Sequence, residues 1–138
     1  MAVSCSTVSS TPAKPGKRIV LAVDDSPIVH LLVRRALEEF YEVITTDDPV
    51  EALSMVYHQP IALLLLDVSM PNLNGLEFCR TLRSLPQFAA LPVVMLTSHD
   101  RPFDKIQGRL AGASEYLTKP FASEVLREVV NRYAPYVV

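Results

Sequence analysis

Short apolar runs alternate with stretches of helical periodicity from residue 19 onward, and this alternation restricts the fold more than any other feature of the chain. The runs are short and most are rich in Val, Ile and Leu, which is typical of buried strands. They are Ile19–Val23, Tyr41–Thr45, Ile61–Leu66, Pro92–Leu96 and Glu115–Leu117. Strict alternation of strands and helices predicts an α/β fold, a doubly wound five-stranded parallel sheet with right-handed crossovers and helices on both faces.

The segments between these runs carry helix signals. Residues 25–27 combine a capping side chain with a proline suited to a first turn, and apolar residues recur at helical spacing from Val29 to Phe40. Residues 48–51 have the spacing of a capping box, with Asp48 and Glu51 as its ends. Further helices are predicted over 76–85, over about 102–110, and over 125–133 with Val125, Leu126, Val129, Val130 and Tyr133 on one side.

Composition predicts one globular domain with a short tail. The chain has 138 residues, 49% of them hydrophobic, and a net charge of -2, which argues against direct nucleic-acid binding. The longest apolar run, Ile61–Val68, falls far short of the roughly 20 residues that span a bilayer, so no membrane insertion is expected. Residues 1–17 contain no Asp or Glu and are rich in Ser and Pro, which predicts a flexible tail before a domain over 18–138.

Cysteine content and the amino-terminal segment bear on location. Cys5 and Cys79 lie far apart and form neither a metal-type pair nor a disulfide framework. No apolar stretch of about 7 residues, the minimum for a signal peptide, precedes Lys14. These features favour a cytoplasmic protein, with an organelle transit peptide as the less favoured interpretation of the tail.

Polar side chains follow the predicted strands. Asp24 and Asp25 follow the first strand and Asp67 the third, while Thr97, Ser98 and Lys119 follow the fourth and fifth. The carboxyl ends of parallel strands meet at one edge, where doubly wound sheets bind their ligands. If the first and third strands are neighbours, three carboxylates converge there, and their mutual repulsion requires a cation. Oxygen ligands without a nearby Cys or His favour Mg²⁺.

This set of side chains fits transfer of a phosphoryl group to Asp67. The carboxylate would attack, a metal ion and the Lys119 ammonium would neutralise charge, and the Thr97 hydroxyl would donate a hydrogen bond. The acyl phosphate product is labile, which suits a timed signal. Taken singly, each group has an ordinary explanation as a helix cap, a turn or a loop residue. Their joint placement at successive strand ends favours the functional interpretation.

A wider set of residues resembles a known family. Asp24-Asp25, Asp67 with Met70-Pro71 and Asn74-Gly75, Thr97-Ser98, Ala111-Gly112-Ala113, Tyr116 and Lys119-Pro120-Phe121 are present. As a set, these motifs resemble the receiver domain of two-component response regulators, in its stand-alone chemotaxis-regulator form, from about Arg18 to Tyr133. The resemblance implies the flavodoxin-like strand order 2-1-3-4-5 and a receiver domain over 18–138.

The resemblance also implies roles at the phosphorylation site. Asp67 would be the phosphoacceptor, Asp25 a direct Mg²⁺ ligand, Asp24 a ligand mainly through bound water, and the backbone carbonyl of Ser69 a further ligand. Lys119 would contact the phosphoryl group and Asp67, and its bond to Pro120 would be cis.

The resemblance further implies a switch and its partners. Thr97 would move toward the phosphoryl oxygen and Tyr116 would swing inward, changing the surface formed by the fourth helix, fifth strand and fifth helix. The donor would be a sensor histidine kinase or a phosphotransfer protein, and the recipient of the signal a downstream effector protein. The chain itself would not be an enzyme, beyond self-catalysed phosphorylation and dephosphorylation. Ser69 and His99 occupy positions that tune hydrolysis in the family, so the phosphoryl lifetime stays open.

Two other functions compete with this interpretation. A Mg²⁺-dependent phosphatase of the haloacid-dehalogenase type also uses a strand-end Asp. Enzymes of that type carry a second acid two residues later, in a D-x-D pattern, and Ser69 occupies that position here. A nucleotide-binding flavodoxin-like protein would need a phosphate-cradling loop after the first strand, and none of the four glycines forms one. The cognate kinase, the effector, the oligomeric state and any continuation into a longer polypeptide stay open.

Overall fold

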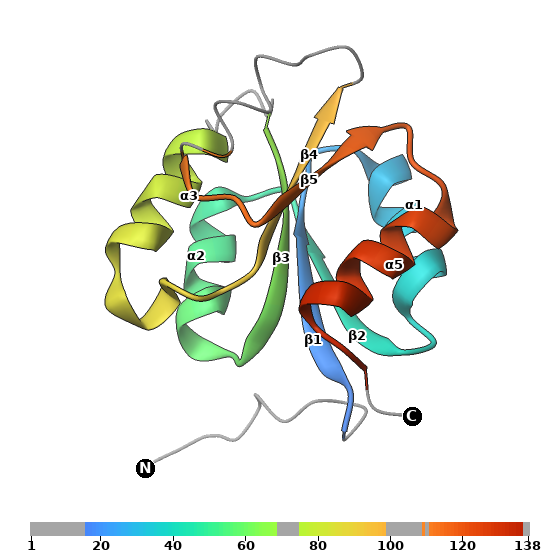
Figure 1. The fold of residues 1–138 in the computed structure, drawn as a ribbon, viewed down its shortest axis with the longest axis horizontal. Helices are drawn as coiled ribbons and strands as arrows, with labels where there is room; N and C mark the ends of the chain where they lie inside the picture. Colours follow the sequence, from blue (N-terminus) through green and yellow to red (C-terminus); the bar gives the residue numbers. More distant parts are fainter. Residues whose placement is uncertain (1–15, 69–74, 99–108, 110, 137–138) are drawn as a thin grey trace.

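The computed structural model describes residues 16–68, 75–98, 109 and 111–136. Five parallel strands form one sheet in the order β2-β1-β3-β4-β5, with α1 and α5 on one face and α2 and α3 on the other (Figure 1). The elements are β1 (Arg18–Val23), α1 (Pro27–Leu37), β2 (Tyr41–Thr46), α2 (Pro49–His58), β3 (Ile61–Asp67), α3 (Gly75–Ser84), the short 3-10 helix η1 (Pro86–Phe88), β4 (Val93–Ser98), β5 (Glu115–Lys119) and α5 (Ser123–Tyr133). The doubly wound fold and its strand order are confirmed. Apart from Arg109 and Val68, the predicted helix over 102–110 and the loop over 68–74 lie outside the described residues.

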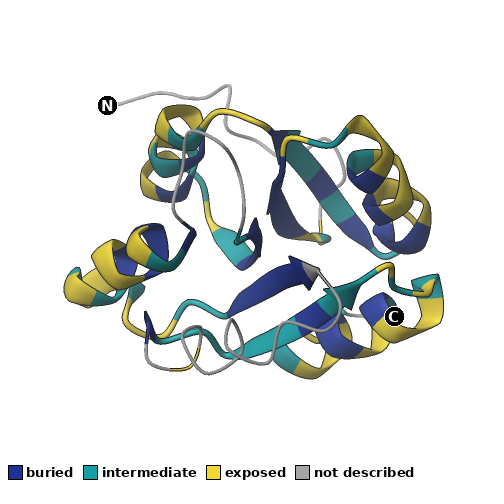
Figure 2. Ribbon diagram, turned by 90° about the horizontal axis from the view of Figure 1, so that it is seen from above, coloured by how far each residue is buried: buried dark blue, intermediate teal, exposed yellow. Residues whose placement is uncertain are grey.

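The central strands are apolar along most of their length because helices cover both of their faces. Residues 19–23 of β1 and 63–66 of β3 are buried, and their side chains point alternately into two cores. One core lies under α1 and α5, the other under α2 and α3, and the exposed residues are on the outer faces of the helices (Figure 2). This sandwich leaves the two ends of the sheet as the places where polar strand-end residues can gather.

Helix α1 starts as predicted and ends earlier than predicted. The Ser26 hydroxyl accepts a hydrogen bond from the Val29 amide at 3.3 Å, which caps the helix. The helix ends at Leu37, so the extension to Phe40 is wrong. Phe40 is half-buried because its ring stacks on Tyr136, with 4.3 Å between ring centroids.

Helix α2 is capped by Asp48, whose Oδ1 accepts from the amides of Val50 at 2.9 Å and Glu51 at 3.4 Å. The reciprocal half of the predicted capping box is absent, because the Glu51 carboxylate accepts instead from the Thr46 hydroxyl at 2.6 Å. The Asp48 amide also donates to that hydroxyl oxygen, at 3.0 Å. The Thr46 hydroxyl therefore bonds both the Glu51 carboxylate and the Asp48 amide, the two groups that a capping box would join directly.

Helix α5 buries Leu126, Val129 and Val130, as its periodicity indicates. Val125, predicted on the same side, is 45% exposed, because the buried stripe begins one residue later at Leu126. Within the described residues, no helix has the length and apolarity needed to cross a membrane.

The carboxyl-terminal segment is fixed to β2 by a buried hydrogen bond. The fully buried Tyr41 hydroxyl donates to the Ala134 carbonyl at 2.8 Å, and burial raises the pKa of Tyr41 to about 12. We expect Tyr41→Phe to lower the free energy of unfolding by about 1–2 kcal/mol, because the Ala134 carbonyl loses its partner. The folded state favours the neutral phenol, so the stability this group contributes is full below pH 10 and falls as pH rises through about 12.

Urea unfolding between pH 8 and pH 12 tests this expectation, with the pH range set by the raised pKa. The exposed Tyr57 provides the control, since Tyr57→Phe should follow the wild-type curve at every pH. A Tyr41→Phe curve that loses as much stability as wild type above pH 10 would contradict the assignment.

Candidate functional site

The carboxyl ends of four strands bring the predicted side chains to one edge of the sheet, the upper edge in Figure 1. Strand β1 pairs with β3 so that Val23 lies opposite Leu66, and the next residues, Asp24 and Asp67, leave the pair side by side. Thr97 follows one strand further, in β4, and Lys119 is the last residue of β5. Residues far apart in the sequence therefore meet because of the strand order.

Three carboxylates form a compact acidic cluster, which we define as Asp24, Asp25 and Asp67. Each offers an oxygen that lies within 4.8 Å of those of the other two. Asp24 is fully buried and Asp67 is 2% exposed, whereas Asp25 is exposed to solvent. Two of the charges are thus shielded from water, and the third faces it.

Lys119 joins two members of the acidic cluster. Its Nζ lies 2.9 Å from Asp24 Oδ2 and 3.3 Å from Asp67 Oδ1, and its side chain is 24% exposed. The following peptide bond, Lys119–Pro120, is cis. The lysine therefore sits between the ends of β1 and β3 from its position at the end of β5.

The pKa values of Asp24 and Lys119 are both raised, for different reasons. Burial raises the pKa of Asp24, and the neighbouring Asp67 raises it further, against the opposing effects of Lys119 and the Ser26 amide. Burial alone would lower the pKa of Lys119, but its interactions with Asp24 and Asp67 outweigh burial and raise it. The lysine is held protonated, while a carboxylate beside it still pays a desolvation cost.

The donor set fits a hard divalent cation. One lysine faces three carboxylates whose oxygens are near one another, so a second cation would relieve the remaining repulsion. The cluster consists of carboxylate oxygens, the ligand type that Mg²⁺ prefers. Asp24, Asp25 and Asp67 are the residues in the described part of the chain that could hold it.

Thr97 supplies a hydroxyl next to the acidic cluster. Its side chain is 2% exposed, and its Oγ1 is a buried oxygen with no hydrogen-bond partner within the described residues. A buried hydroxyl without a partner costs stability, so such a group is ready to donate to an oxygen that arrives at the site. Thr97 lies opposite Thr118, and Tyr116 two positions earlier lies opposite Met95, so Thr97 and Tyr116 face the same side of the sheet.

Gly75 is a site-supporting residue to which the sequence analysis assigned no role. A Cβ atom there would lie 2.6 Å from the backbone carbonyl oxygen of Asp67. Helix α3 therefore begins directly against the end of β3, and any side chain at this position would displace the backbone of Asp67. A glycine at the start of a predicted helix was the available signal. Ser69 and His99 lie outside the described residues.

Comparison with known proteins agrees with this geometry. The family model described as the response regulator receiver domain matches residues 20–131. Response regulator MprA of Mycobacterium leprae is 46% identical over an alignment of 121 residues, which covers 84% of this chain and 52% of that protein. The chain thus spans about half the length of this relative.

Solved structures show the same fold. Chemotaxis protein CheY4 of Vibrio cholerae has a TM-score of 0.79 at 36% identity, covering 85% of this chain and 98% of that one. The receiver domain of sensor histidine kinase PA1611 of Pseudomonas aeruginosa, solved with a magnesium ion coordinated in its active-site cleft, has a TM-score of 0.77 at 25% identity, covering 86% and 98%. The chain belongs to the response regulator receiver domain family, whose members typically accept a phosphoryl group and are not enzymes.

Proposed function

We propose that this chain is a phosphorylation-activated switch of a two-component phosphorelay and that Asp67 accepts the phosphoryl group. The observation that carries the proposal is the placement of Asp67 at the end of β3, nearly buried, within the acidic cluster and 3.3 Å from the Lys119 ammonium. A carboxylate so placed is desolvated on one side and next to positive charge on the other. Both conditions favour attack on an anionic phosphoryl group.

The proposed transfer uses the residues of the site in distinct roles. An oxygen of Asp67 bonds to phosphorus while the bond from phosphorus to the donor nitrogen breaks. Lys119 neutralises charge on the transferred oxygens, and the Thr97 hydroxyl donates to one of them. Asp24, Asp25 and Asp67, with the predicted carbonyl of Ser69, would hold Mg²⁺, which when bound supplies positive charge to the phosphoryl oxygens.

The transfer proposed here also changes the outer surface. When Thr97 turns its hydroxyl toward the phosphoryl group, space opens on the side of the sheet that it shares with Tyr116. Tyr116 is half-buried against the core under α3, so its ring can move into that space. An effector that contacts the surface around β5 and α5 would sense the change.

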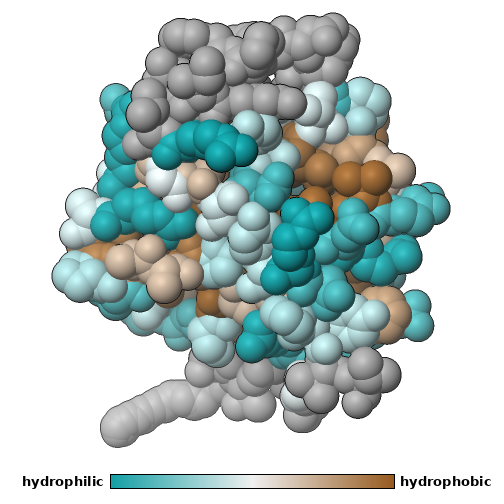
Figure 3. All heavy atoms as spheres, viewed as in Figure 1, coloured by the Kyte–Doolittle hydropathy of each residue, from teal (hydrophilic) through white to brown (hydrophobic). Residues whose placement is uncertain are grey.

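A phosphohistidine protein, either a sensor kinase or a phosphotransfer protein, is the proposed donor in the cytoplasm. Helix α1 begins directly after Asp25 and Ser26 and exposes Ile28 (69%), Leu31 and Leu32. Figure 3 shows apolar surface on the side of the molecule where α1 and α5 lie. This end of α1 adjoins the acidic cluster, so a protein donor bound to its apolar side chains would lie close to Asp67.

Incubation with acetyl phosphate and Mg²⁺ tests the proposed function. Intact-mass spectrometry should show one added phosphoryl group per chain, because a single carboxylate acts as the acceptor. A phosphomonoester offered under the same conditions should not be turned over. Absence of the added group, or steady release of phosphate over many turnovers from the phosphomonoester, would contradict the proposal, and the second result would favour the phosphatase alternative.

A further inference from the structure

A guanidinium group holds the side chain of Tyr116 in two ways. Arg109 Nε donates a hydrogen bond to the Tyr116 hydroxyl at 3.2 Å, and Arg109 Cζ lies 5.4 Å from the centroid of the Tyr116 ring. Arg109 is exposed, so the tyrosine hydroxyl is held at the protein surface. One cation therefore contacts both the polar end and the π face of the same ring.

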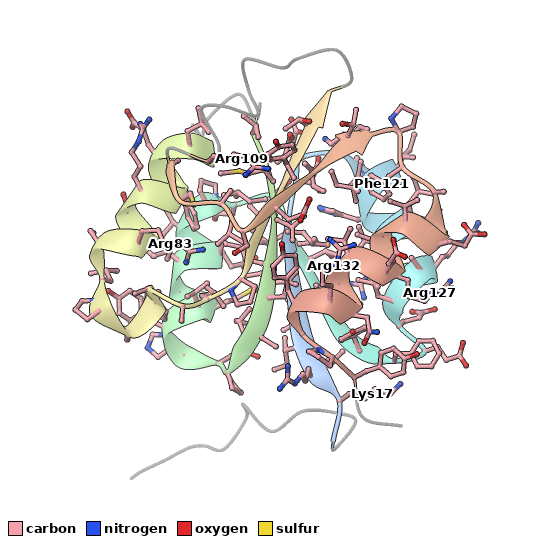
Figure 4. All side chains as sticks on the ribbon, in the orientation of Figure 1. Lys17, Arg83, Arg109, Phe121, Arg127 and Arg132 are labelled. Atoms are coloured by element: carbon pink, nitrogen blue, oxygen red, sulfur yellow. The ribbon has the colours of Figure 1, made fainter. Side chains whose placement is uncertain are left out.

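The backbone that carries Arg109 is tied to Gly112, which α3 in turn holds in place. The Gly112 amide donates to the Arg109 carbonyl at 3.1 Å, and Gly112 adopts φ of 100°, a conformation that favours glycine. Arg83 on α3 then donates to the Gly112 carbonyl at 2.8 Å and to the Phe88 carbonyl at 2.9 Å. Figure 4 places Arg83 beside α3 and Arg109 near the upper edge of the sheet.

Further hydrogen bonds at Ser114 hold the backbone just before β5, which carries Tyr116. Arg83 Nη2 also donates to Ser114 Oγ at 3.4 Å, and the Ser114 amide donates to the Val93 carbonyl at 2.8 Å. Gly112 and Ser114 are thus bound to α3 on one side, and Ser114 is bound to β4 on the other. Because the backbone hydrogen bond to Gly112 restrains the main chain at Arg109, contact with the tyrosine costs mainly the rotamer freedom of the arginine side chain.

We propose that Arg109 is a positioning residue of the switch, whose guanidinium holds the Tyr116 hydroxyl at the surface in the unphosphorylated protein and so sets how readily the ring moves inward. The inference rests on the proposed function, because the inward movement is the step that phosphorylation of Asp67 would favour. Tyr116 lies on the same side of the sheet as the Thr97 hydroxyl, which has no partner among the described residues, so inward movement requires the ring to leave Arg109. Breaking the contact by mutation should therefore act in the same direction as phosphorylation.

The test follows the ring of Tyr116 directly. The chain has five tyrosines and no tryptophan, so labelling with 3-fluorotyrosine gives a small set of ¹⁹F resonances, and the one lost in Tyr116→Phe belongs to residue 116. In the unphosphorylated protein, Arg109→Ala should move this resonance toward its position in the beryllofluoride-treated wild type. Arg109→Lys should behave like Arg109→Ala, because lysine keeps the charge but lacks the planar guanidinium and its Nε donor.

Arg132→Ala is the matched control, since Arg132 carries the same charge, lies on α5 and contacts Glu115 and Glu128 (Figure 4). It should leave the Tyr116 resonance in place. The apparent affinity for beryllofluoride at saturating Mg²⁺ should rise on the order of three- to tenfold in Arg109→Ala, the size expected from losing one exposed cation–π contact and its hydrogen bond. The midpoint of urea unfolding should stay at the wild-type value, which separates positioning from a general structural role.

Three results would overturn the inference. They are an unchanged Tyr116 resonance in Arg109→Ala, an equal shift in Arg132→Ala, and an unchanged affinity for beryllofluoride when the resonance has moved. Failure of the proposed function has a different signature, because the wild type itself would then show no response to beryllofluoride. In that case the resonance shift caused by Arg109→Ala alone would still report whether Arg109 positions the ring.

Discussion

Asp67→Asn is expected to abolish phosphorylation by acetyl phosphate in the presence of Mg²⁺. The amide is a far weaker nucleophile than the carboxylate, and no other acid has the same position beside Lys119 at the end of β3 within the described residues. The variant should fold, because asparagine has nearly the volume of aspartate and its neutral amide removes one repulsive charge next to Asp24. Intact-mass spectrometry measures the loss, and circular dichroism checks the fold.

Asp47→Asn is the matched control for this prediction. Asp47 is an exposed acid that directly follows β2 on the same edge of the sheet, and it lies outside the acidic cluster. The same chemical change there should leave phosphorylation at the wild-type level. Equal labelling of Asp67→Asn and wild type would show that the acceptor is a different residue, and loss in Asp47→Asn would show that surface charge controls the reaction.

Lys119→Met is expected to lower the free energy of unfolding more than Tyr41→Phe does. The lysine neutralises Asp24, which is fully buried, and also contacts Asp67. Removing it leaves buried carboxylates next to one another, so the free energy of unfolding in EDTA should fall by about 2–3 kcal/mol. This is less than the roughly 3–5 kcal/mol typical of breaking a fully buried ion pair, because Lys119 is partly exposed. Guanidinium unfolding measures this change.

Magnesium should restore much of the stability of Lys119→Met, because the cluster then binds a cation in place of the ammonium. At ten times its dissociation constant, a ligand specific for the folded state adds about 1.4 kcal/mol. Lys119→Arg is the control that keeps the charge, and its stability in EDTA should stay close to that of wild type. A Lys119→Met variant as stable as wild type in EDTA would contradict the view that the acidic cluster depends on positive charge.

The strands could be predicted well from the sequence because a buried parallel strand carries its signal within a few residues. Residues 19–23 and 61–66 are continuous apolar runs, and they form most of β1 and β3, respectively. Helix ends and caps were less predictable, because distant residues decide them. Phe40 is half-buried by stacking on Tyr136, and the Glu51 carboxylate accepts a hydrogen bond from Thr46 of the preceding strand.

The candidate site also has features that the sequence predicts and features that it does not. The gathering of Asp24, Asp25 and Asp67 could be anticipated, since strand ends meet at one edge once the strand order is given. Two features could not be anticipated, because both depend on how separate elements pack. They are the lack of a partner for the Thr97 hydroxyl among the described residues and the contact between Arg109 and Tyr116. The role of Ser69 stays a prediction.

Locating the phosphoryl group tests the central claim most directly. After incubation with acetyl phosphate, an acyl phosphate can be reduced with borohydride, which converts the modified aspartate into homoserine, and peptide mass spectrometry then identifies the residue. We predict homoserine at position 67 when Mg²⁺ is present and none when EDTA replaces it. Homoserine at another position, or at position 67 to the same extent in EDTA, would contradict the claim that the acidic cluster and its cation make Asp67 the acceptor.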